Sequence, residues 1–234
     1  MKKLLLPFLV FFATALHSQS RLDSLLPIVH TLPVDSIKVQ TYLDIAWDLL
    51  RRDSEATFHY ADSAENLSHE LQLSSRMARA KRTKSFALSS MGRYKEAEAY
   101  LKAALDLFAE VDDQEMVVDT KVEFGWLKQT QSQLEEAMVY YMEALPLAEK
   151  LDNKNSEARI HSYMGGIYRV QKQHNQAIDH YRTALDIVER LGIKRGISAC
   201  LTNLASTYNT MGNYDTAIAY HKKALILKKE LKDD

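Results

Sequence analysis

Apolar residues recur at spacings of three, four and seven from about residue 35 onward, and short polar breaks interrupt this pattern at regular intervals. The spacing is the helical period and not the alternation of a strand. Two breaks carry turn residues, Gly92-Arg93 and Gly212-Asn213, and two others are polar, Ser132-Gln133 and Lys172-Gln173. The pattern predicts pairs of helices joined by tight turns, that is, αα-hairpins.

The hairpin pattern returns every 40 residues. The recurring alanines are Ala97, Ala137, Ala177 and Ala217 in one series and Ala104, Ala144, Ala184 and Ala224 in another. Helices approach each other closely where the side chain at their crossing is small, so we expect these alanines at helix crossings. A lone hairpin could not bury the tyrosines between them, and neighbouring hairpins must therefore stack.

Two helix starts carry residues that can cap a helix. Asp53-Ser54 precedes an apolar helical stretch and is expected to cap it. Asp112 with Glu115 three residues later fits a capping box.

The repeated residues resemble a known family. The order small residue, aromatic, Gly, aromatic, Ala and Ala-Leu resembles the tetratricopeptide repeat and is clearest in Ala205, Tyr208, Gly212, Tyr214, Ala217 and Ala224-Leu225. The spacing of 40 residues exceeds the family's usual length of about 34, and it resembles the long-helix variant of kinesin light chains and bacterial peptide-sensing regulators. The resemblance covers Ser74 to the C-terminus, and residues 35–71 more weakly. It implies an all-α fold, an α-α superhelix of about five helical hairpins with a right-handed twist.

The N-terminus has the composition of an export signal. Met1-Lys2-Lys3 is basic and Leu4 to Leu16 is almost wholly apolar, as in a secretory signal peptide. This run is shorter than the roughly 20 residues that span a membrane, although an uncleaved anchor is an alternative. We expect a signal peptide at residues 1–18, an N-terminal lid segment at 19–34, and a repeat domain at 35–234 with repeats at about 35–73, 74–112, 113–152, 153–192 and 193–232. The location is then periplasmic or secreted.

Composition and residue spacing limit the kinds of partner and reactive site that we expect. The net charge of −1 gives no indication of a nucleic-acid partner. The single cysteine, Cys200, can form no internal disulfide and is expected to be a buried small hydrophobe. The eight histidines include no pair four residues apart with a third ligand nearby. No phosphate-binding glycine loop is present, and the carboxylates lie on helical faces with Lys and Arg. We expect no catalytic residues, no metal and no cofactor.

The resemblance implies a ligand-binding concave groove lined by the first helix of each hairpin. Carried over to this chain, the groove positions are Arg79, Arg82, Phe86, Asp119, Val122, Trp126, Arg159, Tyr163, Arg169, Asn203 and Asn209. Asn203 stands just before a Leu-Ala pair, where an Asn in the long-repeat relatives holds the backbone of a bound peptide. The arginines would favour an acidic ligand, although ordinary exposed arginines are an equal alternative.

Two functions follow from these observations. The first is a non-enzymatic scaffold of the bacterial cell envelope that binds a protein or peptide. The alternative is the extracytoplasmic sensory region of a signalling protein, a histidine kinase or transcriptional regulator, that lacks its output domain. The C-terminal helix carries Ile218, Leu225, Leu227 and Leu231, more apolar surface than its partner helix can cover, which indicates self-association or another partner there.

Overall fold

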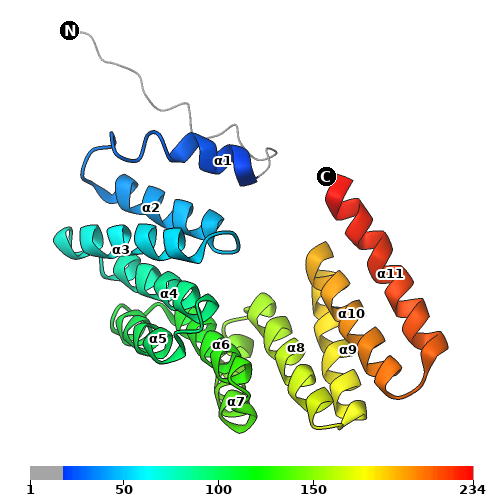
Figure 1. Ribbon diagram of the computed structural model, residues 1–234. Coiled ribbons are helices and arrows are strands. Elements are labelled where there is room, and N and C mark those ends of the chain that lie inside the picture. The colour runs from blue at the N-terminus through cyan, green and yellow to red at the C-terminus, as the bar shows by residue number, and fades with distance from the viewer. Residues whose placement is uncertain (1–17, 234) are drawn as a thin grey trace. The chain divides into compact units, whose positions relative to one another are not determined.

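The computed structural model describes residues 18–233, which form eleven α-helices and no strands (Figure 1). The helices are α1 (Ser18–Leu25), α2 (Ser36–Leu49), α3 (Ser54–Glu70), α4 (Ser74–Ser90), α5 (Tyr94–Glu110), α6 (Gln114–Thr130), α7 (Leu134–Lys150), α8 (Lys154–Val170), α9 (His174–Arg190), α10 (Lys194–Thr210) and α11 (Tyr214–Asp233). The prediction of an all-α fold built from five helical hairpins is confirmed. Apart from Ser18, the expected signal peptide lies outside the described residues. Within residues 18–233, every helix is too short or too polar to cross a membrane.

The chain divides into two compact units at Asp112 and Asp113. The N-terminal unit holds α1 and the hairpins α2–α3 and α4–α5. The C-terminal unit holds the hairpins α6–α7, α8–α9 and α10–α11. The division falls at one of the expected repeat boundaries.

Identical turns set the spacing of the helices. The seven helices from α4 to α10 are each 17 residues long. Among the described residues, the turns place a residue with positive φ at every twentieth position, namely Gln72, Gly92, Asp112, Ser132, Asp152, Lys172, Gly192 and Gly212. The backbone amide of the next residue donates a hydrogen bond to the carbonyl five residues earlier. In one turn, the Arg93 amide donates to the Leu88 carbonyl at 2.9 Å. This is the Schellman motif, which ends a helix in a fixed geometry.

The turn geometry also corrects one of the two predicted caps. Asp53 caps α3 as expected, since its carboxylate accepts from the Ala56 amide at 2.9 Å. The capping box at Asp112 is wrong. Asp112 has a φ of 55° and ends the preceding turn, and Asp113 instead accepts from the Met116 amide at 3.2 Å.

Small residues at the crossings are buried. Ala97, Ala137 and Ala177 are completely buried, and Ala217 is nearly so. In the C-terminal unit the buried rings of Tyr141 and Tyr181 fill the space beside them. These stacked layers form the core that positions α8 and α10.

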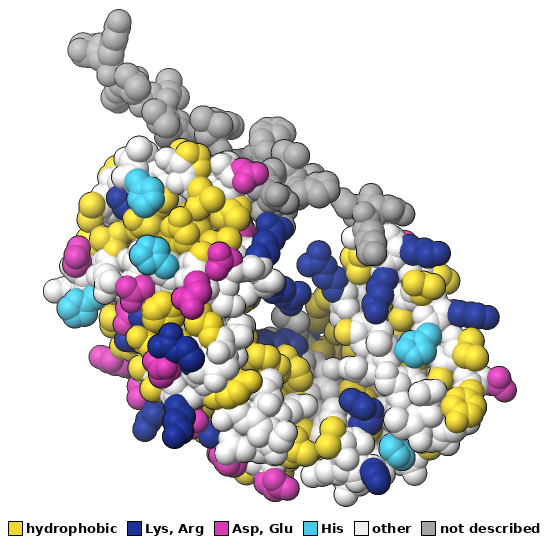
Figure 2. Space-filling view, viewed as in Figure 1, with side chains coloured by type: hydrophobic (Ala, Val, Ile, Leu, Met, Phe, Trp, Pro, Cys, Tyr) yellow, Lys and Arg dark blue, Asp and Glu magenta, His cyan; other side chains and the backbone are white. Residues whose placement is uncertain are grey.

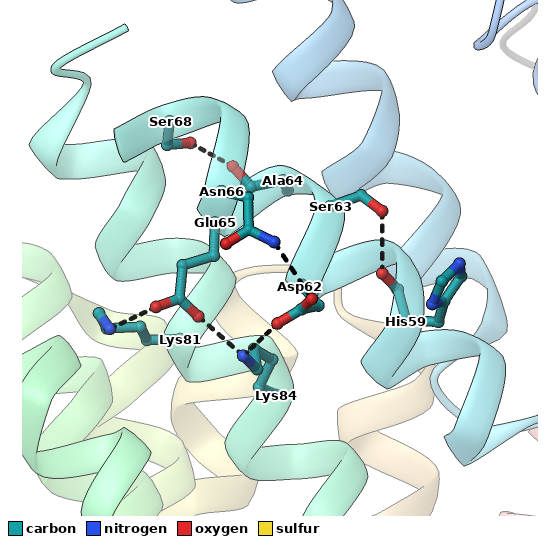
Figure 3. Close-up of polar contacts among 9 residues, drawn as sticks. All are labelled: His59, Asp62, Ser63, Ala64, Glu65, Asn66, Ser68, Lys81 and Lys84. Atoms are coloured by element: carbon teal, nitrogen blue, oxygen red, sulfur yellow. Dashed lines mark hydrogen bonds and ion pairs between the residues drawn. The ribbon is translucent and has the colours of Figure 1, made fainter. Parts of the chain in front are cut away.

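Lys84 occupies a position that is apolar in the later hairpins, yet it is only 3% exposed. Its ammonium donates to Asp62 at 2.6 Å and to Glu65 at 2.9 Å, and it lies 4.3 Å from the centre of the Tyr100 ring. Figure 3 shows Glu65 between Lys84 and Lys81. Burial alone would lower the pKa of Lys84, but hydrogen bonds to Asp62, Tyr100 and Glu65 outweigh it and raise that pKa. Lys84 therefore stays charged and ties α4 to α3.

The segment before α2 packs on the first hairpin. Leu22 and Val29 join Ile45 of α2 in one buried cluster, and Arg21 pairs with Asp44 at 2.7 Å. This packing covers the apolar face of α2 that no preceding hairpin of the described chain contacts.

The last helix has an apolar surface interspersed with lysines. Ile218, Leu225 and Ile226 of α11 are each more than half exposed, whereas Leu227 and Leu231 are half-buried. Figure 2 shows basic side chains, in dark blue, spread over the α10–α11 hairpin beside apolar ones. The predicted strip is therefore centred on Leu225 and Ile226 more than on Leu227.

Candidate functional site

A pocket of about 450 Å³ lies in the C-terminal unit, between α8 and α10, with contributions from α6 and α9. We call it the α8–α10 pocket. It brings together four residues that the sequence predicted, Arg159, Tyr163, Arg169 and Asn203. The other lining residues are Gln129, Asn155, Ala158, Ser162, Gly166, Tyr181, Val188, Ile193, Gly196, Ala199 and Cys200. The lining of the pocket thus combines hydrogen-bond donors with apolar side chains.

Arg159 is held in place by a carboxylate. Its guanidinium donates to Asp119 of α6 at 3.0 Å, and the Ser156 hydroxyl donates to the same oxygen at 2.5 Å. Burial alone would lower the pKa of Arg159, but Asp119, Tyr163 and Glu123 together outweigh burial and raise that pKa. Asp119, which the sequence placed in the groove, therefore serves as the partner that orients Arg159.

Arg169 reaches the pocket from the C-terminal end of α8. Its Nε atom is buried and makes no hydrogen bond. Its guanidinium lies beside Tyr181, where burial raises the pKa of the tyrosine and Arg169 partly offsets that rise. Tyr181 is therefore neutral, and the Arg169 Nε donor is unused.

Tyr163 and Asn203 complete the predicted set. The Tyr163 ring stacks on Tyr141, with their centres 5.5 Å apart. The Asn203 amide donates to the Ser162 hydroxyl at 3.4 Å, a long bond that links α10 to α8. Asn209 is exposed near the end of α10 and does not line the pocket.

Val122 of α6 is wrongly assigned to the groove. It is completely buried and packs in the same cluster as Val118, Tyr141 and Ile160. Positions 119, 122 and 126 share one face of the helix, but Val122 lies at the edge of that face and turns into the core between α6, α7 and α8. Trp126, one turn further along, is half-buried on α6.

The remaining predicted residues belong to the N-terminal unit. Arg79 lines a separate pocket of about 630 Å³ together with Gln40, Gln72, Leu73, Ser74, Ser75, Arg76 and Val111. Arg82 and Phe86 are half-buried on the same helix, α4, and do not line that pocket.

Other reactive groups are held in unreactive settings. Burial raises the pKa of the Cys200 thiol to about 11, so the thiolate that would act as a nucleophile is scarce at neutral pH. The Nδ1 atoms of His161 and His180 lie 2.9 Å apart, and burial lowers the pKa of both rings. Within residues 18–233, no cluster of three or more His, Cys, Asp or Glu side chains could hold a metal ion.

The pocket residues that sequence reasoning missed include Gln129, Gly166 and Tyr181. A signal for Gly166 was present in the 40-residue register, because the matching positions hold Phe86, Trp126 and Ser206. The neighbouring Gly165 occupies the small position that the repeat requires, and it obscures this signal. The histidine pair was missed because its members lie 19 residues apart on different helices.

Solved structures share this fold. The structure of BtubC (BKLC) from P. vanneervenii matches with a TM-score of 0.68 at 19% identity, over 92% of this chain and 89% of that one. A Rap protein complexed with competence and sporulation factor matches with a TM-score of 0.65 at 14% identity, over 92% and 71%. A STAND protein with a tetratricopeptide repeat sensor, from Pyrococcus horikoshii, matches with a TM-score of 0.70 at 14% identity, over 91% and 33%.

Sequence comparison identifies the family. No curated protein sequence matches the chain. The family model described as tetratricopeptide repeat matches residues 76–150 and 156–230. These two stretches make up more than half of the chain and contain every residue that lines the pocket except Asn155. With hairpins, turns and sequence in agreement, the chain belongs to the tetratricopeptide repeat family.

Proposed function

We propose that this protein is a non-enzymatic scaffold that binds a protein or peptide segment in the α8–α10 pocket. The observation that carries the proposal is the convergence of Arg159, Tyr163, Arg169 and Asn203 on one pocket. These side chains offer hydrogen-bond donors, an amide and an aromatic surface, next to the apolar wall of Val188 and Ile193. Such a mixture suits a peptide, whose backbone needs polar partners and whose side chains need apolar ones.

A solved relative supports a ligand of this class. The Rap protein with the similar fold was crystallised in complex with competence and sporulation factor. The proposal of binding in place of catalysis also rests on the setting of Cys200, whose raised pKa disfavours the thiolate.

The proposal includes export to the periplasm or beyond. Its support is the basic start and apolar run of residues 1–16. N-terminal sequencing of protein recovered from the envelope fraction should give a first residue between Leu16 and Gln19. Recovery of intact Met1 on protein from the cytoplasm would contradict export.

A second candidate is a sensory region of a signalling protein. It is favoured by the similarity to the STAND protein, in which the tetratricopeptide repeats are described as a sensor. The DNA downstream of this gene tests the candidate. A kinase or DNA-binding domain encoded in frame or in the adjacent gene would support it over an independent scaffold.

Binding is tested with captured partners that are then identified. Protein retained from an envelope extract would be digested and mapped, and the retained segment would be synthesised and titrated by calorimetry. We expect Asn203→Ala to weaken its affinity roughly tenfold, a loss of about 1.4 kcal/mol. Asn209→Ala is the matched control, because Asn209 lies on the same helix outside the pocket. Equal affinity for wild type and Asn203→Ala, or an equal loss in both variants, would argue against the pocket.

A further inference from the structure

One face of α7 carries three exposed apolar residues, which we call the α7 stripe. Val139 and Met142 are each more than half exposed, and Pro146, one turn after Met142, is exposed as well. Their spacings of three and four residues place them on one face of the helix. The second helices of two other hairpins are small or charged at the matching positions, which are Ala99, Lys102 and Asp106 in α5 and Asp179, Arg182 and Asp186 in α9. The hairpin itself therefore does not require apolar residues on this face.

Pro146 leaves a hydrogen-bond acceptor without its usual partner on the α7 stripe. In a regular helix, the amide of residue 146 would donate to the carbonyl of Met142. Proline has no N–H, so the Met142 carbonyl loses that bond. A partner that covers the stripe and brings a hydrogen-bond donor would satisfy both the apolar side chains and this carbonyl.

Acidic side chains border the α7 stripe. Helix α7 carries four glutamates and a single lysine. Glu135 and Glu149, one at each end of the stripe, are exposed. Glu136 and Glu143 each pair with a lysine of α6, and about half of their side-chain surface remains exposed. A partner that matches this face is therefore apolar at its centre and basic around it.

Helix α11 has the matching chemistry. Ile218, Lys222, Leu225 and Lys229 follow one another at spacings of four, three and four residues, so they share one face of the helix. All four are exposed, and the exposed Ile226 lies beside them. The stretch from Ile218 to Lys229 holds four lysines and no acidic residue. This face is apolar and basic where the α7 stripe is apolar and acidic.

The two faces are both uncovered within one chain. Helix α7 packs against α6 and α8, and α11 packs against α10. Because the α7 stripe and the basic face of α11 are exposed in the described chain, neither covers the other. A contact between them therefore needs two copies of the protein.

We propose that the basic face of α11 in one copy packs on the α7 stripe of a second copy. Leu225 and Ile226 cover the apolar side chains of the stripe, the lysines lie near the glutamates, and a lysine ammonium donates to the Met142 carbonyl. The proposal is separate from the proposed function, since neither helix lines the α8–α10 pocket.

A contact between two different surfaces has a consequence for assembly. Each chain that is bound through α11 still offers its own α7 stripe, so the assembly grows beyond two chains unless it closes into a ring. A contact of α11 with α11 would instead stop at two chains. It would also bring the lysines of both copies together, where like charges repel.

The first test blocks each surface by itself. Met142→Lys blocks the α7 stripe, and the helix tolerates it because Lys102 and Lys222 occupy the matching positions of α5 and α11. Leu225→Lys blocks α11. We expect the mass of the wild type, measured by light scattering, to exceed one chain and to rise with concentration, and each variant to have the mass of one chain. A single-chain wild type at high concentration overturns the proposal.

Ala99→Lys is the matched control for added charge. Ala99 is exposed on α5 at the position that matches Val139 of the α7 stripe. This variant should keep the wild-type mass. If it has the mass of one chain, as Met142→Lys is expected to have, added charge alone prevents association and the role of the α7 stripe is overturned.

Mixing the two blocked variants is the decisive test. Met142→Lys retains an intact α11 and Leu225→Lys retains an intact α7 stripe, so an equimolar mixture should have the mass of two chains and no more. A mixture that stays at the mass of one chain overturns the proposal. A wild-type mass for Met142→Lys alone also overturns it, because α11 would then bind a different surface.

Charge reversal tests the same contact with the apolar residues left in place. The double variants Glu135→Lys/Glu149→Lys and Lys222→Glu/Lys229→Glu change only exposed positions, and urea unfolding verifies that both are folded. At low ionic strength each should have the mass of one chain, because like charges then face each other. Their equimolar mixture should again exceed the mass of one chain. Failure of the mixture to associate overturns the pairing of α11 with α7.

Discussion

Gly125 of α6 lies against the ring of Tyr141 of α7 so closely that a β-carbon on the glycine would overlap the ring. Gly165 has the same relationship to Tyr181, with a separation of 2.9 Å from the position of the missing β-carbon. The hairpin of α4 and α5 has Ser85 and Leu101 at these places. The first-helix residue is thus smallest where its partner on the second helix is a tyrosine.

Gly125→Ala should therefore destabilise the protein by about 1–3 kcal/mol, the usual cost of overpacking a core. The loss outweighs the gain in helix propensity. The double variant Gly125→Ala/Tyr141→Leu should recover part of the stability, because it restores the small-to-medium pairing of Ser85 and Leu101. Urea unfolding of the four proteins of this cycle measures the coupling. Strict additivity would show that the two side chains do not compete for the same space.

The turn position with positive φ gives a second prediction. Lys172 has a φ of 62°, and Gly212 occupies the same position of another turn with a φ of 78°. Lys172→Gly should stabilise the protein by about 0.5–1 kcal/mol, since relief of the left-handed strain exceeds the entropy that glycine adds to the unfolded chain. Gly212→Ala should destabilise it by about 1 kcal/mol. Thermal unfolding measures both, and shifts of the same sign would contradict the explanation.

The buried ammonium of Lys84 gives a third prediction. Lys84→Ala leaves a cavity and removes the partner of Asp62 and Glu65, so we expect a loss of about 3 kcal/mol. Lys84→Met fills the same space and should recover at least about 1 kcal/mol of that loss. Equal stability of the two variants in urea unfolding would mean that packing of the stem contributes nothing.

The raised pKa of Lys84 also predicts how its contribution to stability varies with pH. The pKa of Lys84 is raised above its ordinary value of 10.5. A raised pKa gives stability that is fully present below the unfolded value and is lost only as pH rises through the folded one. Ionisation of Lys84 itself should therefore leave its contribution unchanged between about pH 6 and pH 9. A decline across that range in wild type that is absent in Lys84→Met would contradict it.

Because of His161 and His180, we expect the stability of the fold to fall at acidic pH. Burial lowers the pKa of both rings, and for His180 the neighbouring His161 lowers it further. A lowered histidine pKa gives stability that is present above the unfolded value near 6.5 and is lost as pH falls toward the folded values. The nearby charges of Glu157 and Asp179 oppose this effect only in part.

The matched variant is His180→Tyr, because the other hairpins have Tyr100, Tyr140 and Tyr220 at this position. We expect wild-type stability to fall between about pH 7 and pH 5 more steeply than that of the variant. Urea unfolding across this range provides the slopes. Identical slopes would show that the pair does not contribute to the acid sensitivity.

The exposed apolar residues of α11 lead us to expect self-association of the protein. Its exposed Leu225 and Ile226 lie among lysines that limit but do not cover the apolar surface. Leu225→Lys should reduce the mass measured by light scattering to that of one chain. Thr216→Lys, earlier on the same helix, controls for added charge. A single-chain mass for the wild type at high protein concentration would remove the prediction.

The repeat register made the fold predictable. A spacing of 40 residues between alanines is enough to place helix crossings, because only small residues allow close approach. It could not distinguish Asp112 from Asp113 as the cap, since that depends on which residue takes positive φ. The repeat register also could not show that Lys84 pairs with Asp62 and Glu65, about twenty residues earlier. Ion pairs between helices depend on side-chain rotamers, which no sequence pattern encodes.

The site was less predictable than the fold. Arg159, Arg169 and Asn203 were identified by carrying over the groove positions that the family resemblance implies, which indicate the face of a helix. Val122 was misassigned because register does not indicate where that face meets the core. Gly166 carries no side-chain chemistry that a sequence could reveal, and its contribution is the close approach that it allows to Gln129 and Tyr181.

A residue with positive φ recurs at every twentieth position from Gln72 to Gly212, so the chain is built from segments of equal length. Excising residues 153–192 would join Asp152 directly to Ile193, so a positive-φ residue would still precede the residue that starts a first helix. Removing only 20 residues would join two helices of the same kind and turn every later core face outward. The gene can therefore lose or gain hairpins in steps of 40 codons, whereas a step of 20 codons keeps the turns but mismatches the core faces.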